Sequence, residues 1–321
     1  MGTGRDGRAG SHHGPGRTAA PGPRGKKVRR RRLPSRPDHR RRFRYQGHAE
    51  GTGNHPQGRR DRGGELTRPS AKNLLLVGGS GLVGTAITPY LQPHHNLRVL
   101  DLNAPQHDDV EYVEGSIADP EAVRRALDGM DGFITMAMKG GQGGHDRHHT
   151  LEQAIDNYTV NCLGHHVLLL TAFEMGVSRG IYTGTMSVHN RHRTWYPSEE
   201  EVPLDGPNVY GLTKGLTEEI CRYFTREYDM SLLVYRITGP CNRAMFIDRI
   251  KNPPGDPKLY YTDEEDMAEA YLAGLRFLDQ AGNGRCEVFF ISGDEDCEEM
   301  NMAKARELLG WAPSARKRLG I

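Results

Sequence analysis

The sequence predicts an α/β fold built on a doubly wound parallel sheet. Short apolar segments alternate with helical patterns that are long enough to cross from one parallel strand to the next. A glycine-rich turn follows the first apolar segment and opens the first helical pattern. Residues 1–70, in contrast, show no apolar periodicity. We therefore expect a folded body at 71–321 and a disordered tail before it.

The tail is basic and the body is acidic. Residues 1–70 hold 19 of the 43 basic residues and 5 of the 41 acidic residues, which leaves 24 basic and 36 acidic residues in 71–321. Such a tail buries too little apolar surface to offset its chain entropy. Its arginine runs suit a nucleic-acid-binding or nuclear-targeting arm, since they would neutralise phosphates. The plainer interpretation, which we favour, is upstream sequence read from a wrongly chosen start.

The body is expected to alternate strands and helices in chain order. The expected strands lie at about 73–77, 97–102, 110–115, 131–138, 178–185 and 231–236. Three helices are expected: one starts at about Leu82, one covers 151–176 and one covers 208–228. Pro89 falls inside the first helix, where its missing N–H should kink or shorten it. A small C-terminal substrate lobe is expected from about 190–205 and 240–321.

The glycine-rich turn has the context of a dinucleotide site. With 40 glycines in 321 residues, the spacing of Gly78, Gly81 and Gly84 also arises by chance. Here it follows an expected strand, opens an expected helix, and precedes Asp101 at the end of the next strand. The first glycine allows the tight turn, the second lets a pyrophosphate approach the helix N-terminus, and the third lets helix and strand pack closely. The sheet is therefore expected to be of the Rossmann type.

Asp101 predicts which cofactor the turn binds. Its carboxylate would accept hydrogen bonds from the adenosine ribose hydroxyls and would repel a 2′-phosphate. The sequence therefore predicts NAD rather than NADP. The alternative is a structural turn followed by a surface aspartate.

A second group of polar residues lies near the middle of the chain. Tyr210 and Lys214 in "NVYGLTK" share one face of the expected helix, and Thr185 ends the strand "SRGIYTGT" upstream. A lysine cation about 4 Å from a phenol contributes about 4 kcal/mol at an effective dielectric of 20, or roughly three pKa units. We expect Tyr210 to take a proton from an alcohol as hydride leaves for a nicotinamide, with Thr185 holding the reacting oxygen. The alternative is ordinary roles for all three: a half-buried tyrosine, a solvated lysine and a strand threonine.

Other patterns exclude several classes of protein. No apolar segment approaches the roughly 20 residues that span a bilayer, so no membrane partner is expected. The stretch "HDRHH" at 145–149 lacks nearby carboxylate or thiolate partners, and no metal site is expected there. The cysteines fit a reducing cytosol, because none has paired or metal-ligand spacing: Cys162, Cys221, Cys241, Cys286 and Cys297.

The chain from about Asn73 to Trp311 resembles the extended short-chain dehydrogenase/reductases, also called the NAD-dependent epimerase/dehydratase family. "DGFITMAM" resembles the family's D-x-V-I-H-L-A-A strand, and "GVSRGIYTGTMSV" resembles its catalytic strand G-V-K-R-F-V-Y-T-S-S-x-S-V-Y-G. Further similar segments are "GGSGLVG", "VEGSIAD", "NCLG", "YRITGP", "DEEDMAEAYLAGL" and "ELLGWAP". Within the family, the short C-terminal part and "GTAITPYLQPHHNLRVLDL" look most like the compact uronate dehydrogenases.

The resemblance implies roles for the matched residues. Asn161 stands for the helix asparagine near the active site, and Arg236 for an arginine that binds the substrate carboxylate of uronates. The implied catalytic residues are Tyr210, Lys214, Thr185 and Asn161. The implied substrate-binding residues are Thr185, Tyr210 and Arg236. The implied NAD-binding residues are Gly78, Gly81, Leu82, Val83, Gly84, Asp101, Ser116, Ile117, Met136, Ala137, Tyr210 and Lys214, with Ser116 in the place of the usual aspartate.

The function expected from these residues is NAD-dependent oxidation of a sugar or sugar-acid alcohol in the cytoplasm. One alternative is an epimerase or dehydratase of nucleotide-sugars on the same scaffold, and another is a non-catalytic NAD-binding regulator. The retained Thr185, Tyr210 and Lys214 favour an enzyme, because a sensor needs the glycine turn but no base. The two long helices are also expected to offer a surface for a homodimer. Nucleic acid is expected as a partner only if the basic tail is real.

Overall fold

The computed structural model describes residues 71–140, 148–190, 192–253 and 260–321. The predicted tail, 1–70, lies outside these residues, as do residues 145–147 of the histidine-rich stretch. Among the described residues, no helix is both long and apolar enough to cross a membrane. All five cysteines are free thiols.

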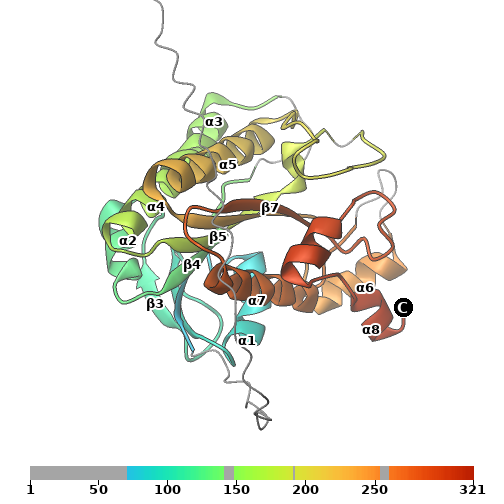
Figure 1. Ribbon diagram of the computed structural model, residues 1–321, viewed down its shortest axis with the longest axis horizontal. Coiled ribbons are helices and arrows are strands. Elements are labelled where there is room, and N and C mark those ends of the chain that lie inside the picture. Colours follow the sequence, from blue (N-terminus) through green and yellow to red (C-terminus); the bar gives the residue numbers. More distant parts are fainter. Residues whose placement is uncertain (1–70, 141–147, 191, 254–259) are drawn as a thin grey trace, which may run out of the picture. The chain divides into compact units, whose positions relative to one another are not determined.

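A seven-stranded parallel sheet forms the centre of the fold (Figure 1). Its strand order is β3-β2-β1-β4-β5-β6-β7, with every neighbouring pair parallel. The predicted Rossmann-type sheet is therefore confirmed. The strands are β1 (Asn73–Val77), β2 (Asn96–Asp101), β3 (Glu111–Glu114), β4 (Gly132–Thr135), β5 (Arg179–Thr185), β6 (Ser231–Ile237) and β7 (Cys286–Ile291).

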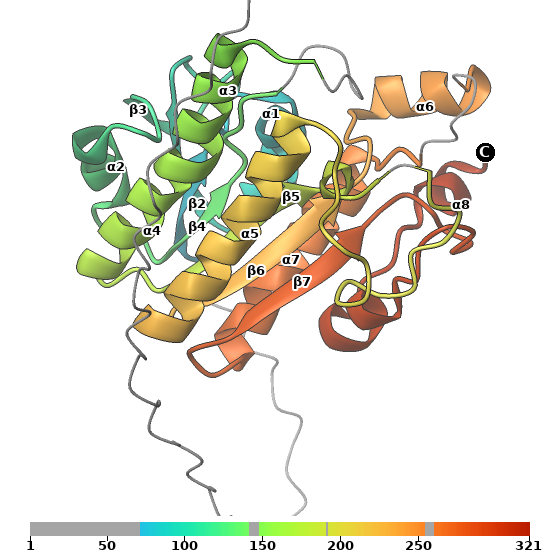
Figure 2. The ribbon, with the colours of Figure 1, turned by 90° about the horizontal axis from the view of Figure 1, so that it is seen from above.

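Helices cover both faces of this sheet, which explains why its strands are apolar on both sides. The helices are α1 (Leu82–Leu91), α2 (Pro120–Leu127), α3 (Leu151–Asn157), α4 (His165–Glu174), α5 (Val209–Tyr228), α6 (Arg243–Lys251), α7 (Glu264–Gln280) and α8 (Ala315–Leu319). Helices α1 and α7 pack on the face that carries Leu74 and Leu76. Helices α2, α4 and α5 pack on the face that carries Leu75 and Val77. Figure 2 shows α4 and α5 side by side over that second face.

The long helix expected at 151–176 is interrupted by a π-helical segment. Thr150 caps α3 with its side chain, and Gln153 completes the capping box. The backbone then widens into a π-helix over Tyr158–Gly164 before α4 continues to Glu174. Segments of this kind occur mostly as local bulges, and often at functional sites.

The expected effect of Pro89 is compensated by a side chain. The proline removes the N–H that would bond the Thr85 carbonyl oxygen, yet α1 continues to Leu91. That oxygen lies 2.7 Å from His107 Nε2, which donates to it because a carbonyl only accepts. The helix therefore keeps its length with a substitute donor from the loop after β2.

The C-terminal lobe contains elements that the sequence did not predict. β7 extends the sheet beyond β6, and α6 and α8 lie outside the sheet's two helical layers (Figure 2). The insert near 190–205 joins this lobe through a bridge between Tyr196 and Met300. Segments that are about 100 residues apart in the sequence thus lie side by side, at the end of the sheet where β5 and β6 finish.

Candidate active site

The glycine turn is shaped by close backbone contacts. Gly78 has φ +78°, and a Cβ there would lie 2.5 Å from the Ala137 nitrogen. A Cβ on Gly84 would lie 2.3 Å from the Gly79 carbonyl oxygen. Both distances are far below van der Waals contact, so these glycines are required by the fold itself. The third glycine of the motif thus packs the helix against the turn rather than against a strand.

Gly81 has a different reason to be glycine. It is the N-cap of α1 and places no side chain over the helix N-terminus. A Cβ there would meet only the Gly78 oxygen, at 3.3 Å. That contact is tight, but packing within the chain restricts this position less than it restricts Gly78 or Gly84. A helix N-terminus without a side chain over it can bind an anion through its first N–H groups.

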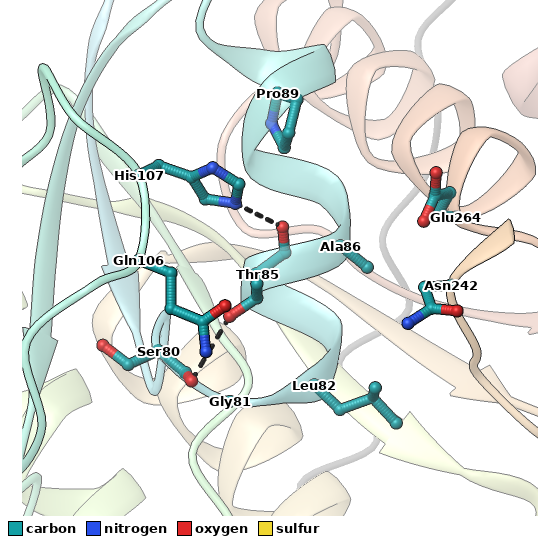
Figure 3. A pocket seen from close by; sticks show the side chains of 10 residues that line it. All are labelled: Ser80, Gly81, Leu82, Thr85, Ala86, Pro89, Gln106, His107, Asn242 and Glu264. Carbon is teal, nitrogen blue, oxygen red and sulfur yellow. Dashed lines mark hydrogen bonds between the residues drawn. The ribbon is translucent and has the colours of Figure 1, made fainter. Parts of the chain in front are cut away.

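A hollow of about 400 Å³ lies beside this turn. Figure 3 shows Gln106 and His107 on one side of α1, with Asn242 and Glu264 on the other. Its remaining lining residues come from the turn and α1: Ser80, Gly81, Leu82, Thr85, Ala86 and Pro89. The hollow therefore joins the glycine turn to the loop after β2 and to the C-terminal lobe.

Asp101 lies at the glycine turn, as predicted. Its Oδ2 accepts a hydrogen bond from the Ser80 backbone nitrogen at 3.1 Å, and its Oδ1 accepts one from the Asn103 nitrogen at 3.1 Å. Both bonds orient the carboxylate at the end of β2. Because a carboxylate oxygen has two lone pairs, it can also accept from a ribose hydroxyl.

The other predicted cofactor residues lie at the carboxyl ends of β3 and β4. The Met136 nitrogen donates to the Val77 oxygen at 2.7 Å, which holds the β4 end against the glycine turn. Ser116 Oγ accepts from the Ala118 nitrogen at 3.2 Å, and Ile117 is buried. In an open parallel sheet, ligands bind outside these ends, where the strand order reverses. The reversal here lies between β1 and β4.

Tyr210 and Thr185 are brought together as predicted. Tyr210 lies in the first turn of α5, which Asn208 caps by accepting a hydrogen bond from the Gly211 nitrogen at 2.8 Å. A hydrogen bond with Thr185 lowers the Tyr210 pKa, but burial outweighs it and raises that pKa to about 12. The phenol Oη also donates to Met138 Sδ at 3.5 Å.

Lys214 is buried one turn further along α5. Its Nζ donates to the Thr183 carbonyl oxygen at 2.7 Å and lies 4.3 Å from the centre of the Tyr182 ring. Burial lowers the Lys214 pKa to about 7. The expected lowering of the Tyr210 pKa by Lys214 is absent here, because the ammonium faces β5 rather than the phenol.

Asn161 binds the backbone of the segment after β4 and a side chain of α5. Its Oδ1 accepts from the Lys139 nitrogen at 2.8 Å, and its Nδ2 donates to the Lys139 oxygen at 3.0 Å. The same Nδ2 donates to Thr213 Oγ1 on α5 at 3.0 Å. The π-helix thus carries an amide that fastens the segment after β4 to the first turns of α5.

Arg236, which was predicted to bind the substrate carboxylate, is buried and bound within the chain. Its guanidinium is 1% exposed and binds Glu218 through two hydrogen bonds, Nε to Oε1 at 2.9 Å and Nη2 to Oε2 at 2.7 Å. Its Nη1 donates to His189 Nε2 at 3.2 Å and to the Glu199 oxygen at 2.8 Å. The arginine therefore joins β6 to α5 and to the segment after β5.

His189 and Met138 were missed by the sequence reasoning. His189 Nδ1 lies 2.8 Å from the Pro203 carbonyl oxygen, so Nδ1 carries the proton and Nε2 accepts from Arg236. Burial lowers the His189 pKa to about 4, which keeps the ring neutral. The only available signal for Met138 was its position, where the family pattern D-x-V-I-H-L-A-A has its last alanine.

Comparison with known proteins gives one family and several distant relatives. A family model described as the NAD dependent epimerase/dehydratase family matches residues 74–286. An N-acetyl-alpha-D-glucosaminyl-diphospho-ditrans,octacis-undecaprenol 4-epimerase of Escherichia coli O157:H7 is 28% identical over 57% of this chain and 54% of its own. A uronate dehydrogenase of Pseudomonas syringae pv. tomato is 26% identical over 56% of this chain and 65% of its own. The chain thus spans about half to two thirds of these relatives.

Solved structures share the fold. A UDP-glucose 4-epimerase from Brucella ovis in complex with NAD has a TM-score of 0.61 at 17% identity. The similarity covers 76% of this chain and 94% of that one.

Proposed function

Because the chain belongs to the NAD-dependent epimerase/dehydratase family, we propose that it is an NAD-dependent oxidoreductase acting on a sugar or sugar-acid alcohol. The observation that carries this proposal is that Thr185, the last residue of β5, and Tyr210, in the first turn of α5, lie together at the carboxyl end of the sheet. A regulator that only binds the dinucleotide has no use for this hydroxyl pair.

NAD fits the residues at the end of the sheet. The turn at Gly78 and the uncovered N-terminus of α1 would hold the pyrophosphate, and Asp101 would accept from the adenosine ribose. Ser116 and Ile117 would border the adenine, while Met136 and Ala137 would lie along the nicotinamide half. When bound, oxidised NAD supplies the hydride acceptor and a positive charge on its ring.

Asp101 is expected to set the preference for NAD over NADP. Asp101→Asn should weaken NAD binding by about tenfold, since a hydrogen bond to a charged acceptor contributes roughly 1.5 kcal/mol or more. It should also reduce the difference between the affinities for NAD and NADP, because the charge that repels a 2′-phosphate is gone. Titration with both cofactors measures this. Asp108→Asn, in the loop that follows β2, is the matched control and should leave the preference unchanged. Equal NAD and NADP binding by the unmodified protein would refute the assignment.

In the proposed reaction, Tyr210 exchanges a proton with the substrate oxygen. With a pKa of about 12, its phenol is protonated near neutral pH and can donate to a developing alkoxide in the reductive direction. In the oxidative direction Tyr210 must lose that proton first. Because Lys214 is bound to the Thr183 oxygen, the positive charge that favours this loss would come from the ring of oxidised NAD. Thr185 would donate to the reacting oxygen.

Epimerisation on the same scaffold is the second candidate. An epimerase returns the hydride to the same substrate, so it needs the same hydroxyl pair and the same cofactor. The length of the chain does not separate the two, because the similarity to the Brucella ovis epimerase covers 94% of that chain. The lobe at 190–205 and 240–321 is proposed to bind the substrate in either case.

Incubation with NAD and a panel of free sugars, uronates and nucleotide-sugars tests the function. A dehydrogenase accumulates NADH and an oxidised product, and an epimerase converts its substrate without net NADH. Tight NAD binding with neither result across the panel would favour the regulator.

The proposed assembly is a homodimer through the helical layer of α3 and α5. Apolar side chains are exposed there at helical spacing: Leu151, Ile155, Tyr158 and Leu163 on α3 and the π-helix, and Leu212, Leu216 and Tyr223 on α5. Leu212→Glu should therefore shift the protein to the monomer in sedimentation or light scattering. Leu308→Glu, at an exposed leucine of the C-terminal lobe, should not. A monomeric unmodified protein would contradict the proposal.

A further inference from the structure

Met138 is the side chain that the structure places directly on the proposed base. Tyr210 Oη donates to its Sδ at 3.5 Å. A thioether is a weak acceptor, so this contact leaves the phenol ready to exchange its proton. A stronger hydrogen-bond acceptor in the place of this sulfur would hold the Tyr210 proton more tightly.

The backbone around Met138 is fixed, so the contact does not depend on a free loop end. Both backbone groups of Lys139 are bound by Asn161, which also binds Thr213 one turn after Tyr210. On the other side, a Cβ on Gly140 would lie 2.9 Å from the Met138 methyl carbon, so the side chain packs against that glycine. Asn161 thus ties the backbone next to Met138 to the helix that carries Tyr210.

Met138 is nevertheless open to solvent. It is 47% exposed, whereas Met136 is 7% exposed and Met230, Met267 and Met302 are 0% exposed. Among the methionines that the structure describes, Met245 on α6 is the other strongly exposed one, at 38%. Small oxidants therefore reach Met138 and Met245 before the buried methionines.

We propose that Met138 is an oxidation site through which hydroperoxides switch off the proposed base Tyr210. The sulfur attacks one peroxide oxygen, an S–O bond forms and the O–O bond breaks. The attacked oxygen gives up its proton to the leaving oxygen, which departs as water or an alcohol. Sulfur loses two electrons and the peroxide gains them.

The product changes what the phenol meets. A sulfoxide oxygen is a strong acceptor, so the Tyr210 hydroxyl donates to it and keeps its proton. The added oxygen also fills space beside Oη that a substrate alcohol needs. The block is reversible, because methionine sulfoxide reductases restore the thioether.

The contact can be tested without any substrate, which separates this inference from the proposed function on which it rests. Hydrogen peroxide is added in a time course, and oxidation at Met138 and Met245 is followed by peptide mass spectrometry. The hydrogen bond draws on a sulfur lone pair, so Tyr210→Phe should speed oxidation of Met138 by about twofold or more. Oxidation of Met245 should keep its rate in that variant. An unchanged Met138 rate would overturn the contact, whatever the activity.

Turnover on a substrate found in the panel tests the switch. Activity should fall by about tenfold or more, and it should fall at the same rate as Met138 is oxidised. Each unit by which the pKa of the base rises lowers the fraction of its deprotonated, reactive form about tenfold. Sulfoxide reductases should restore it. The activity of each variant is compared with its own activity before peroxide is added. Met138→Leu should keep its activity, whereas Met245→Leu should lose activity as the unmodified protein does. Full oxidation of Met138 with unchanged turnover, or equal loss in Met138→Leu, would overturn the proposal.

Discussion

Replacing Tyr210 by phenylalanine is expected to lower turnover by about 10²-fold to 10⁴-fold while NAD still binds. The substitution keeps the ring and removes the hydroxyl that Thr185 and Met138 contact. The fold should be unaffected, because the lost hydroxyl lies at the half-buried start of α5. The loss of turnover is measured in both directions of the reaction, NAD binding by titration, and the stability of the fold by thermal unfolding. Near-normal turnover in Tyr210→Phe would refute the assignment of the base.

Thr185 provides the graded control for the same site. Thr185→Ser keeps a hydroxyl for the reacting oxygen and should retain much of the rate, whereas Thr185→Ala should not. The pH dependence follows from the raised Tyr210 pKa: a base is active when deprotonated, so oxidation should rise with pH through the alkaline range. A profile that is flat there would show that another group takes the proton.

Removing Arg236 is expected to have the largest effect on stability. Arg236→Met removes both hydrogen bonds of the guanidinium from the Glu218 carboxylate, whose side chain is 0% exposed, and leaves it the longer contact with Arg222 at 3.7 Å. Breaking a buried ion pair on one side lowers the free energy of unfolding by about 3–5 kcal/mol. Urea unfolding of the purified variant measures this.

The double variant distinguishes a lost ion pair from lost packing. Replacing both Arg236 and Glu218 by apolar residues removes the uncompensated charge, so its loss of stability should be smaller than that of Arg236→Met alone. Arg285→Met is a matched control, because Arg285 forms a surface ion pair with Glu287 and should change stability by about 1 kcal/mol or less. A stable Arg236→Met variant would show that the network does not support the fold.

The sequence predicted the parts of the fold that depend on local pattern. Apolar runs identified β1, β2 and β5 almost to the residue, and the glycine turn was found because its spacing and context are local. β7 was missed, since its pairing with β6 is a long-range contact that no short window contains. The π-helix was missed for a related reason: its apolar pattern continues that of the flanking helices.

The site shows the same division. Tyr210 and Thr185 were predicted from their types and their places at element ends. The orientations of the Lys214 and Arg236 side chains could not be predicted, because each depends on a partner from a distant segment. The partner is the Thr183 oxygen for the lysine and Glu218 for the arginine. Residue type shows that a group is cationic. Only the fold decides whether its charge is already neutralised.

The π-helix at Tyr158–Gly164 has a consequence for how this region can change in length. A π-helix holds an extra residue within a helical segment, so deleting one residue there would return the backbone to α-helical register. Each residue advances an α-helix by about 100°, but the wider π turn absorbs the extra residue, so α3 would keep nearly the same direction and face relative to α4. The change would fall on the hydrogen bonds within the widened segment, such as the one from Asn161 to Asn157 at 3.1 Å. A single-codon deletion in this segment would thus be less damaging than one inside α4, where no extra residue is present to absorb it.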